Sequence, residues 1–89
     1  MISYLTVDRV EGNCAVCELE LIDVEEIQNT EYKDRETQMI DIMVYYLGND
    51  IKEGDVLLVE HYGEVIVKVL GKDEREKQRR IEALKKIGF

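Results

Sequence analysis

The stretch VDRVEGNCAVCELE, residues 7–20, decides how this chain begins to fold, because it contains two strand-like runs separated by Gly12 and Asn13. The run before this pair, residues 2–11, mixes polar side chains with β-branched and aromatic ones. The run after it, residues 14–21, alternates apolar and polar positions with the period of a strand. A glycine-containing pair between two such runs is typical of a β-hairpin. We therefore predict two antiparallel strands at the start of the fold.

The same stretch contains a CxxC spacing, formed by Cys14 and Cys17. In an extended strand, residues three apart point to opposite faces, so these thiols cannot share a metal ion or form a disulfide without a local kink. A structural zinc site needs four Cys or His ligands, and with His61 the chain supplies three. We interpret both cysteines as ordinary strand residues, with Cys17 in the core. We predict no metal and no cofactor.

Three further strands are predicted at residues 36–42, 56–62 and 65–70, the last two joined by a turn at Gly63 and Glu64. Residues 43–47 are a compact apolar run that predicts one short helical turn. Residues 22–35 are polar and acidic, and we interpret them as a long hairpin excursion with its tip near Asn29. The predicted inward row of the last two strands consists of Leu57, Val59, Val65, Val67 and Val69.

A helix is predicted from Asp73 onward, after Gly71 and Lys72 break the sheet. Asp73 and Glu76 have the spacing of a helix-capping motif, and Glu76 can pair with Arg80 one turn later. The helix has a narrow apolar stripe, made of Ile81, Leu84 and Ile87. We therefore expect its second half to dock on the sheet and its first two turns to project into water.

These elements predict a mainly β fold, either a small antiparallel β-barrel or a curled sheet of about five strands, with one C-terminal α-helix. We expect a single domain over residues 1–89, with a β-barrel body over residues 1–72 and the helix over residues 73–89. The sequence has no apolar run of about 18 residues and no signal-peptide pattern at its start, so we expect a cytoplasmic protein that does not enter a membrane.

The charge is distributed unevenly. The net charge is −8, but residues 73–89 contain six basic and four acidic residues, which leaves a net charge of −10 on residues 1–72. An acidic body repels phosphate, so nucleic acid is not an expected partner. The basic residues of the helix are interspersed with Glu76 and Glu82, and the predicted helix lacks the aromatic residues on which bases stack, apart from its terminal Phe89.

Three blocks of the chain resemble a known family. They are VDRVEGNCAVCELE, IKEGDVLLVE and the terminal DEREKQRRIEALKKIGF, with a strand ending in IDI between the first two. Together they resemble the small bacterial domain of unknown function numbered 3006. The resemblance implies a small β-barrel with an attached helix, found alone or appended to hydrolases of the metallo-β-lactamase type, and it implies no catalytic residue. The chain departs from the family pattern in the length of residues 22–35 and in the extra strand at residues 65–70.

The remaining polar candidates do not form a recognisable catalytic set. His61 has no nucleophile or orienting group near it in the sequence, and we interpret it as a strand histidine near the sheet edge. Four carboxylates could bind a cation or form a solvated acidic face, and we favour the solvated face; they are Asp8, Glu11, Glu18 and Glu20. Arg9 is expected to pair with Asp8 or Glu11. We therefore expect no enzymatic activity.

An exposed apolar patch is the remaining candidate for a functional surface. The residues that we assign to it are Tyr45, Tyr46, Leu58, Tyr62 and Ile66, with Tyr32 as a further tyrosine. Such a patch marks a protein partner more often than an active site, although packing of the helix on the same face would also explain it. We expect an uncharacterised non-enzymatic protein-interaction or accessory module that binds a protein partner or a second copy of itself, without a small-molecule substrate. An oligonucleotide-binding small β-barrel is the alternative.

Overall fold

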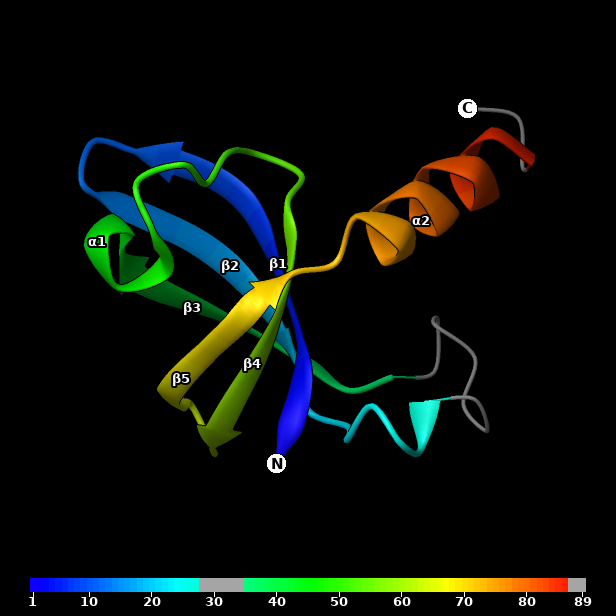
Figure 1. Ribbon diagram of the computed structural model, residues 1–89, viewed down its shortest axis with the longest axis horizontal. Helices are drawn as coiled ribbons and strands as arrows, with labels where there is room; N and C mark the ends of the chain where they lie inside the picture. The colour runs from blue at the N-terminus through cyan, green and yellow to red at the C-terminus, as the bar shows by residue number, and fades with distance from the viewer. Residues whose placement is uncertain (28–34, 87–89) are drawn as a thin grey trace.

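The computed structural model describes residues 1–27 and 35–86 (Figure 1). Within these residues, five strands form one antiparallel sheet in the order β3-β2-β1-β4-β5. The strands are β1 (Ile2–Glu11), β2 (Cys14–Glu20), β3 (Thr37–Met43), β4 (Val56–Tyr62) and β5 (Val65–Lys72), and the helices are α1 (Val44–Leu47) and α2 (Glu74–Lys86). The prediction of a mainly β fold with a C-terminal helix is confirmed, and the described strands form a curled sheet that is not closed.

The hairpin predicted from residues 7–20 is present as β1 and β2. Val7 lies opposite Cys17 and Val10 lies opposite Ala15 in the antiparallel register. Gly12 adopts a φ of 61° in the turn, a left-handed conformation that glycine reaches without a steric penalty. Because β1 also pairs with β4, it is the central strand of the sheet.

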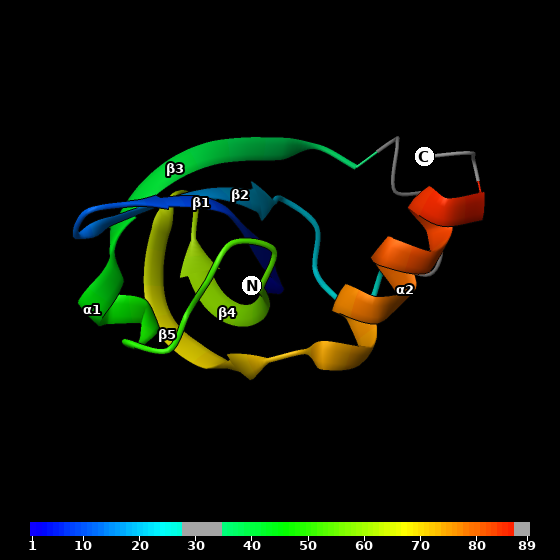
Figure 2. The same cartoon turned by 90° about the horizontal axis from the view of Figure 1, so that it is seen from above.

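The core lies on the inner, concave side of the sheet. Leu5, Leu19 and Leu57 come from three adjacent strands and are fully buried there, together with Val59 and Cys17. Leu5 lies opposite both Leu19 and Leu57 in the two registers, so the three side chains point to the same face. Figure 2 shows how the curl brings β3 and β5 round to opposite sides of this interior.

The predicted inward row is only partly correct in β5. Leu57, Val59 and Val69 contact the core as expected, but Val65 and Val67 are exposed and Ile66 packs inward instead. The reason is a register shift, because His61 pairs with Ile66 and Glu60 pairs with Lys68, which leaves Val67 as an extra residue. An extra residue reverses the alternation of faces that a regular strand would have. The strand also continues through Lys72, beyond the predicted break.

The predicted docking of α2 was wrong. Ile81 is 37% exposed and Leu84 is 54% exposed, and α2 contains no buried residue within Glu74–Lys86; Ile87 lies outside the described residues. The backbone N–H of Asp73 donates to the carbonyl oxygen of Val56, so the first turn of α2 begins against the sheet. From this point the helix extends away from the strands (Figures 1 and 2). The first two turns therefore make the contacts, and the second half is solvated.

The cap of α2 is confirmed, because the Oδ1 atom of Asp73 accepts a hydrogen bond of 3.0 Å from the backbone N–H of Glu76. The ends of the excursion over residues 22–35 stay together, since the N–H of Leu21 donates to the carbonyl of Glu36 at 2.8 Å. Its predicted tip near Asn29, and Tyr32, lie outside the described residues. Neither helix in the described part of the chain is long and apolar enough to cross a membrane.

Candidate partner-binding site

The candidate site is a groove between the two strands at the ends of the sheet. In the described part of the chain, β3 pairs with β2 alone and β5 pairs with β4 alone, so each has one edge without a strand partner. The curl of the sheet places these edges on the two sides of a groove of about 430 Å³. Ten residues line this groove, which we call the edge slot: Ile40, Asp41, Ile42, Met43, Tyr46, Glu64, Ile66, Val67, Lys68 and Val69.

The edge slot is where the apolar interior reaches solvent. Four of its side chains pack against the core while remaining half-buried: Ile40, Ile42, Ile66 and Val69. Met43 and Val67 add exposed apolar surface beside them. Along β3, Ile40 and Ile42 are separated by the exposed Asp41, as expected for a strand with one face toward the core. The edge slot therefore has an apolar floor and a more polar rim.

Side chains define the two ends of the edge slot. The amide nitrogen of Gln38 donates to the carboxylate of Glu64, which links the start of β3 to the turn before β5. At the opposite end, Tyr46 of α1 lines the slot, and its ring stacks on that of Tyr45 with centroids 4.3 Å apart. The tyrosine pair is a large and largely apolar contact surface with polar tips.

The structure separates the five predicted partner-binding residues. Tyr46 and Ile66 line the edge slot, and Tyr45 stacks on Tyr46. Tyr62 is 66% exposed at the end of β4 and does not line the slot. Leu58 is half-buried on the outer face of β4, opposite Tyr4 of β1. The predicted inward row of Val65, Val67 and Val69 would place Ile66 on the outer face with Leu58, and this was wrong, because Ile66 packs against the core.

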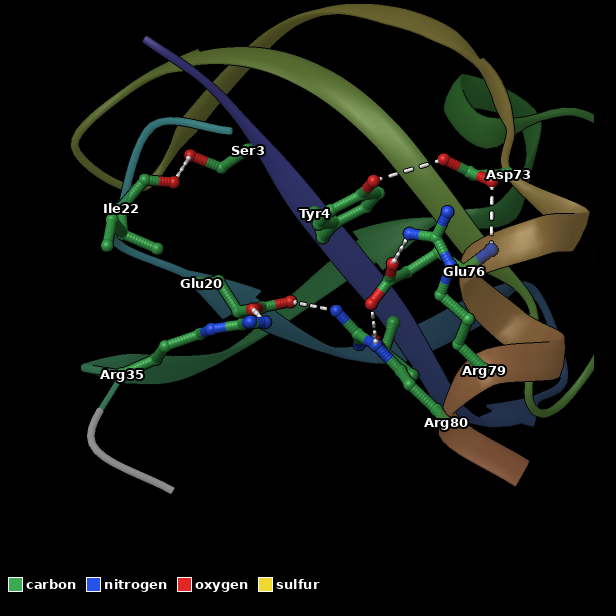
Figure 3. A network of polar contacts seen from close by, with 10 residues as sticks. Ser3, Tyr4, Glu20, Ile22, Arg35, Asp73, Glu76, Arg79 and Arg80 are labelled. Carbon is green, nitrogen blue, oxygen red and sulfur yellow. Dashed lines mark hydrogen bonds and ion pairs between the residues drawn. The ribbon is translucent and has the colours of Figure 1, made fainter. Parts of the chain in front are cut away.

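The outer face of the sheet carries a network of charged side chains beneath α2 (Figure 3). Glu20 is fully buried, and its two carboxylate oxygens accept hydrogen bonds from Arg35 at 2.8 Å and from Arg80 at 2.6 Å. Arg80 also donates to the hydroxyl of Thr6 at 2.8 Å and lies over the ring of Tyr4 at 5.2 Å. The prediction that Glu20 belongs to a solvated acidic face was therefore wrong, because a guanidinium group from α2 covers it.

A second buried acid holds the start of α2. Asp55 is 1% exposed and accepts hydrogen bonds from Lys77 at 3.0 Å and from the backbone N–H of Lys52 at 2.9 Å, while Lys72 lies 3.1 Å away. Although burial raises the pKa of Asp55, the hydrogen bonds from Lys77 and Lys52 outweigh it, and the pKa lies below its usual value. Asp55 is therefore ionised at neutral pH and paired with cations.

Tyr4 and Asp73 complete this contact between helix and sheet. We call the polar contact as a whole the polar joint, and it consists of Tyr4, Thr6, Glu20, Asp55, Asp73, Glu76, Lys77 and Arg80. The hydroxyl of Tyr4 donates to Asp73 at 3.1 Å (Figure 3). Burial and this hydrogen bond raise the pKa of Tyr4 to about 12, so its hydroxyl remains a donor at neutral pH. The predicted pairing of Glu76 with Arg80 is also present, at 3.2 Å.

His61 is buried in the interior, with 2% exposure, although we predicted a position near the sheet edge. Its Nε2 atom lies 2.8 Å from Oγ of Ser3, and its Nδ1 atom lies 2.8 Å from the carbonyl oxygen of Gly63. The Ser3 hydroxyl donates its hydrogen to the carbonyl of Ile22 at 2.7 Å. The Gly63 carbonyl only accepts, so a hydrogen bond there needs the ring hydrogen on Nδ1, and the roles of Nε2 and Oγ depend on the ring tautomer.

A serine beside a histidine is a combination that nucleophilic enzymes use, and sequence reasoning missed it because 58 residues separate the two. Ser3 is fully buried, however, and its hydroxyl is already bonded to Ile22. In this position the pair links β1 to β4 on the inner face of the sheet.

The cysteines lie as the strand geometry predicted. Cys17 is fully buried in the core, and Cys14 is half-buried at the start of β2. Burial raises the pKa of the Cys17 thiol to about 12, so it stays protonated at neutral pH. The predicted pairing of Arg9 is confirmed, at 2.8 Å from Asp8 and 2.6 Å from Glu11. Within residues 1–27 and 35–86, no three His, Cys, Asp or Glu side chains gather as a metal site would require.

No family model, no curated protein and no solved structure matches this chain. The resemblance to the bacterial family numbered 3006 therefore stays a prediction.

Proposed function

We propose that this protein is a non-enzymatic interaction or accessory module of the cytoplasm, and that its protein partner binds at the edge slot. The observation that supports this proposal is that half-buried core side chains, among them Ile42 and Ile66, are open to solvent between two strand edges that have no strand partner among residues 1–27 and 35–86. A partner that covers them removes apolar surface from water, at about 25 cal/mol for each Å². Unpaired strand edges beside such a surface favour a protein over a small polar ligand.

The charge distribution favours a protein partner over nucleic acid. Asp41 and Glu64 line the edge slot, and residues 1–72 carry a net charge of −10, which opposes the approach of phosphate. Several cations of α2 are engaged within the molecule, since Lys77 pairs with Asp55 and Arg80 pairs with Glu20. Oligonucleotide binding remains the alternative function that an experiment has to exclude.

The test uses two tyrosines of nearly equal exposure. Tyr46 is 65% exposed and lines the edge slot, whereas Tyr62 is 66% exposed and does not. Each is replaced in turn by a photoreactive benzoylphenylalanine in cells that make the protein naturally, and the cells are irradiated. We expect a covalent protein adduct from position 46 and none from position 62. Equal adducts from both positions, or none from either, would contradict the proposal.

Fluorescence anisotropy with single-stranded and duplex oligonucleotides tests the alternative directly. At about 50 mM salt we expect no saturable binding, because an acidic body repels phosphate. Micromolar binding that weakens steeply as salt rises, together with no protein adduct from position 46, would establish the oligonucleotide-binding function instead.

A further inference from the structure

The directions of the two edge strands indicate what the edge slot can accept. β1 is antiparallel to β2, which is antiparallel to β3, so β3 runs in the same direction as β1. By the same reasoning through β4, β5 also runs in the direction of β1. The two edges of the slot are therefore parallel to each other. One extended segment running the opposite way between them would be antiparallel to both and would complete a six-stranded antiparallel barrel.

We propose that the edge slot binds a basic, extended segment of a partner protein, which inserts as the missing strand and pairs with β3 and β5 together. This inference rests on the proposed function and specifies its ligand. Strand addition of this kind obtains affinity from main-chain hydrogen bonds and specificity from alternate side chains. Here two edges are available to one segment, so both sides of its backbone can be paired.

The floor of the edge slot determines which kind of side chain the inserted segment can turn inward. Ile40 and Ile42 from β3 and Ile66 and Val69 from β5 are half-buried against the core. In an inserted strand, every second side chain points to this floor, and those positions have to be apolar. The intervening positions point to solvent and can be charged. The ligand therefore alternates apolar and polar residues.

The rim of the edge slot sets the charge of the ligand. Asp41 is exposed on β3 and Glu64 precedes β5, and the surrounding body is strongly acidic. Among the described residues that line the slot, Lys68 is the one basic side chain, and it lies opposite Glu60 in the sheet register. The negative charge around the slot attracts a basic segment, whereas it repels a second copy of the chain, which has a net charge of −8. We therefore expect a different protein to supply the strand.

The probes are three fluorescent peptides of about nine residues, the length of a long strand. The first alternates valine with lysine, the second alternates valine with glutamate, and the third is the lysine peptide with two valines replaced by proline. Anisotropy titrations of the intact protein should show saturable binding of the lysine peptide, weaker binding at high salt, and at least about tenfold weaker binding of the other two. The proline peptide separates strand pairing from plain charge attraction.

A matched pair of variants locates the site. Asp41→Lys changes an exposed charge in the edge slot, and Glu53→Lys makes the same change at an exposed position of the loop before β4, outside the slot. We expect Asp41→Lys to weaken binding of the lysine peptide about fivefold or more and Glu53→Lys to weaken it less than about twofold. Circular dichroism spectra of both variants should match that of the natural protein.

The results separate failure of this inference from failure of the proposed function. Equal binding of the lysine and glutamate peptides, full binding of the proline peptide, or equal effects of Asp41→Lys and Glu53→Lys would overturn strand insertion. Sedimentation showing a dimer that Asp41→Lys changes would assign the slot to a second copy and overturn it as well. If no peptide binds while position 46 still gives a protein adduct, strand insertion fails and the proposed function stands.

Discussion

The inner face of the sheet and the polar joint hold this molecule together by different physical means. On the inner face, Leu5, Leu19 and Leu57 exclude water with no polar partner required. At the polar joint, Glu20 and Arg80 are held by directed, charge-assisted hydrogen bonds. The comparison shows that the charged half of a helix can be the half that docks, while Ile81 and Leu84 of its apolar stripe stay exposed.

The two regions should respond differently to substitution. Apolar packing loses free energy in proportion to the volume removed, so its largest effects come from shortening a buried side chain. A buried ion pair depends on both partners, so its largest effect comes from removing one charge and leaving the other buried.

The largest effect is expected on the inner face. Leu57→Ala should lower the free energy of unfolding by about 3 to 4 kcal/mol, because it leaves a cavity in a fully buried position between β1 and β5. Urea denaturation followed by circular dichroism measures this change. A loss below about 1 kcal/mol would show that the interior is not packed as described.

A smaller effect is expected at the polar joint. Glu20→Gln keeps the shape of the side chain but removes the charge that Arg35 and Arg80 share, and should cost about 2 to 3 kcal/mol. The matched control is Glu11→Gln, which removes an exposed carboxylate paired with Arg9 and should leave the unfolding transition unchanged. Equal transitions for the two variants would contradict a buried, energetically important joint.

Acid should weaken the polar joint through Asp55. Its folded pKa lies below the unfolded value of 3.8, so its ionised form stabilises the fold above pH 4, and this contribution is lost as pH falls through the folded pKa. Asp55→Asn should cost about 1 to 2 kcal/mol at pH 7 by weakening the contact with Lys77. Urea denaturation at pH 7, 5 and 3 should show that the difference in free energy of unfolding between the natural protein and Asp55→Asn shrinks only at the lowest pH. A constant difference would contradict the pairing.

The smallest effect is expected in the second half of α2. Leu84 is exposed, so Leu84→Ala should change the free energy of unfolding by less than about 0.5 kcal/mol. Docking through the apolar stripe would instead make this substitution cost about 2 kcal/mol or more. The same urea denaturation distinguishes the two arrangements.

The parts of the fold that depend on neighbouring residues could be predicted from the sequence. The β1–β2 hairpin follows from the turn at Gly12, and the start of α2 follows from Asp73 and Glu76. The face of β5 could not be predicted, because the extra residue Val67 appears only when the strand is aligned with β4. Side chains alternate between the two faces of a strand only while the hydrogen-bond ladder to the next strand is regular, and a bulge interrupts that regularity.

Contacts between polar residues that are far apart in the sequence could not be predicted either. Glu20 was predicted to be a solvated acid of its strand, but it is buried beside Arg35 and beside Arg80, which is 60 residues away in the sequence. The edge slot is a similar case. Tyr46 and Ile66 were predicted as partner-binding residues, but the groove they line exists because the curl of the sheet brings its two ends together.

Amide hydrogen exchange measured by NMR, with and without the valine–lysine peptide, tests the central claim that the sheet is a barrel lacking one strand. We predict that the slot-facing amides of both β3 and β5 exchange more slowly when the peptide is bound, because each edge gains hydrogen bonds. Amides in the second half of α2 provide the control and should not change. Protection of one edge alone, or of neither edge while the peptide is bound, would contradict the claim.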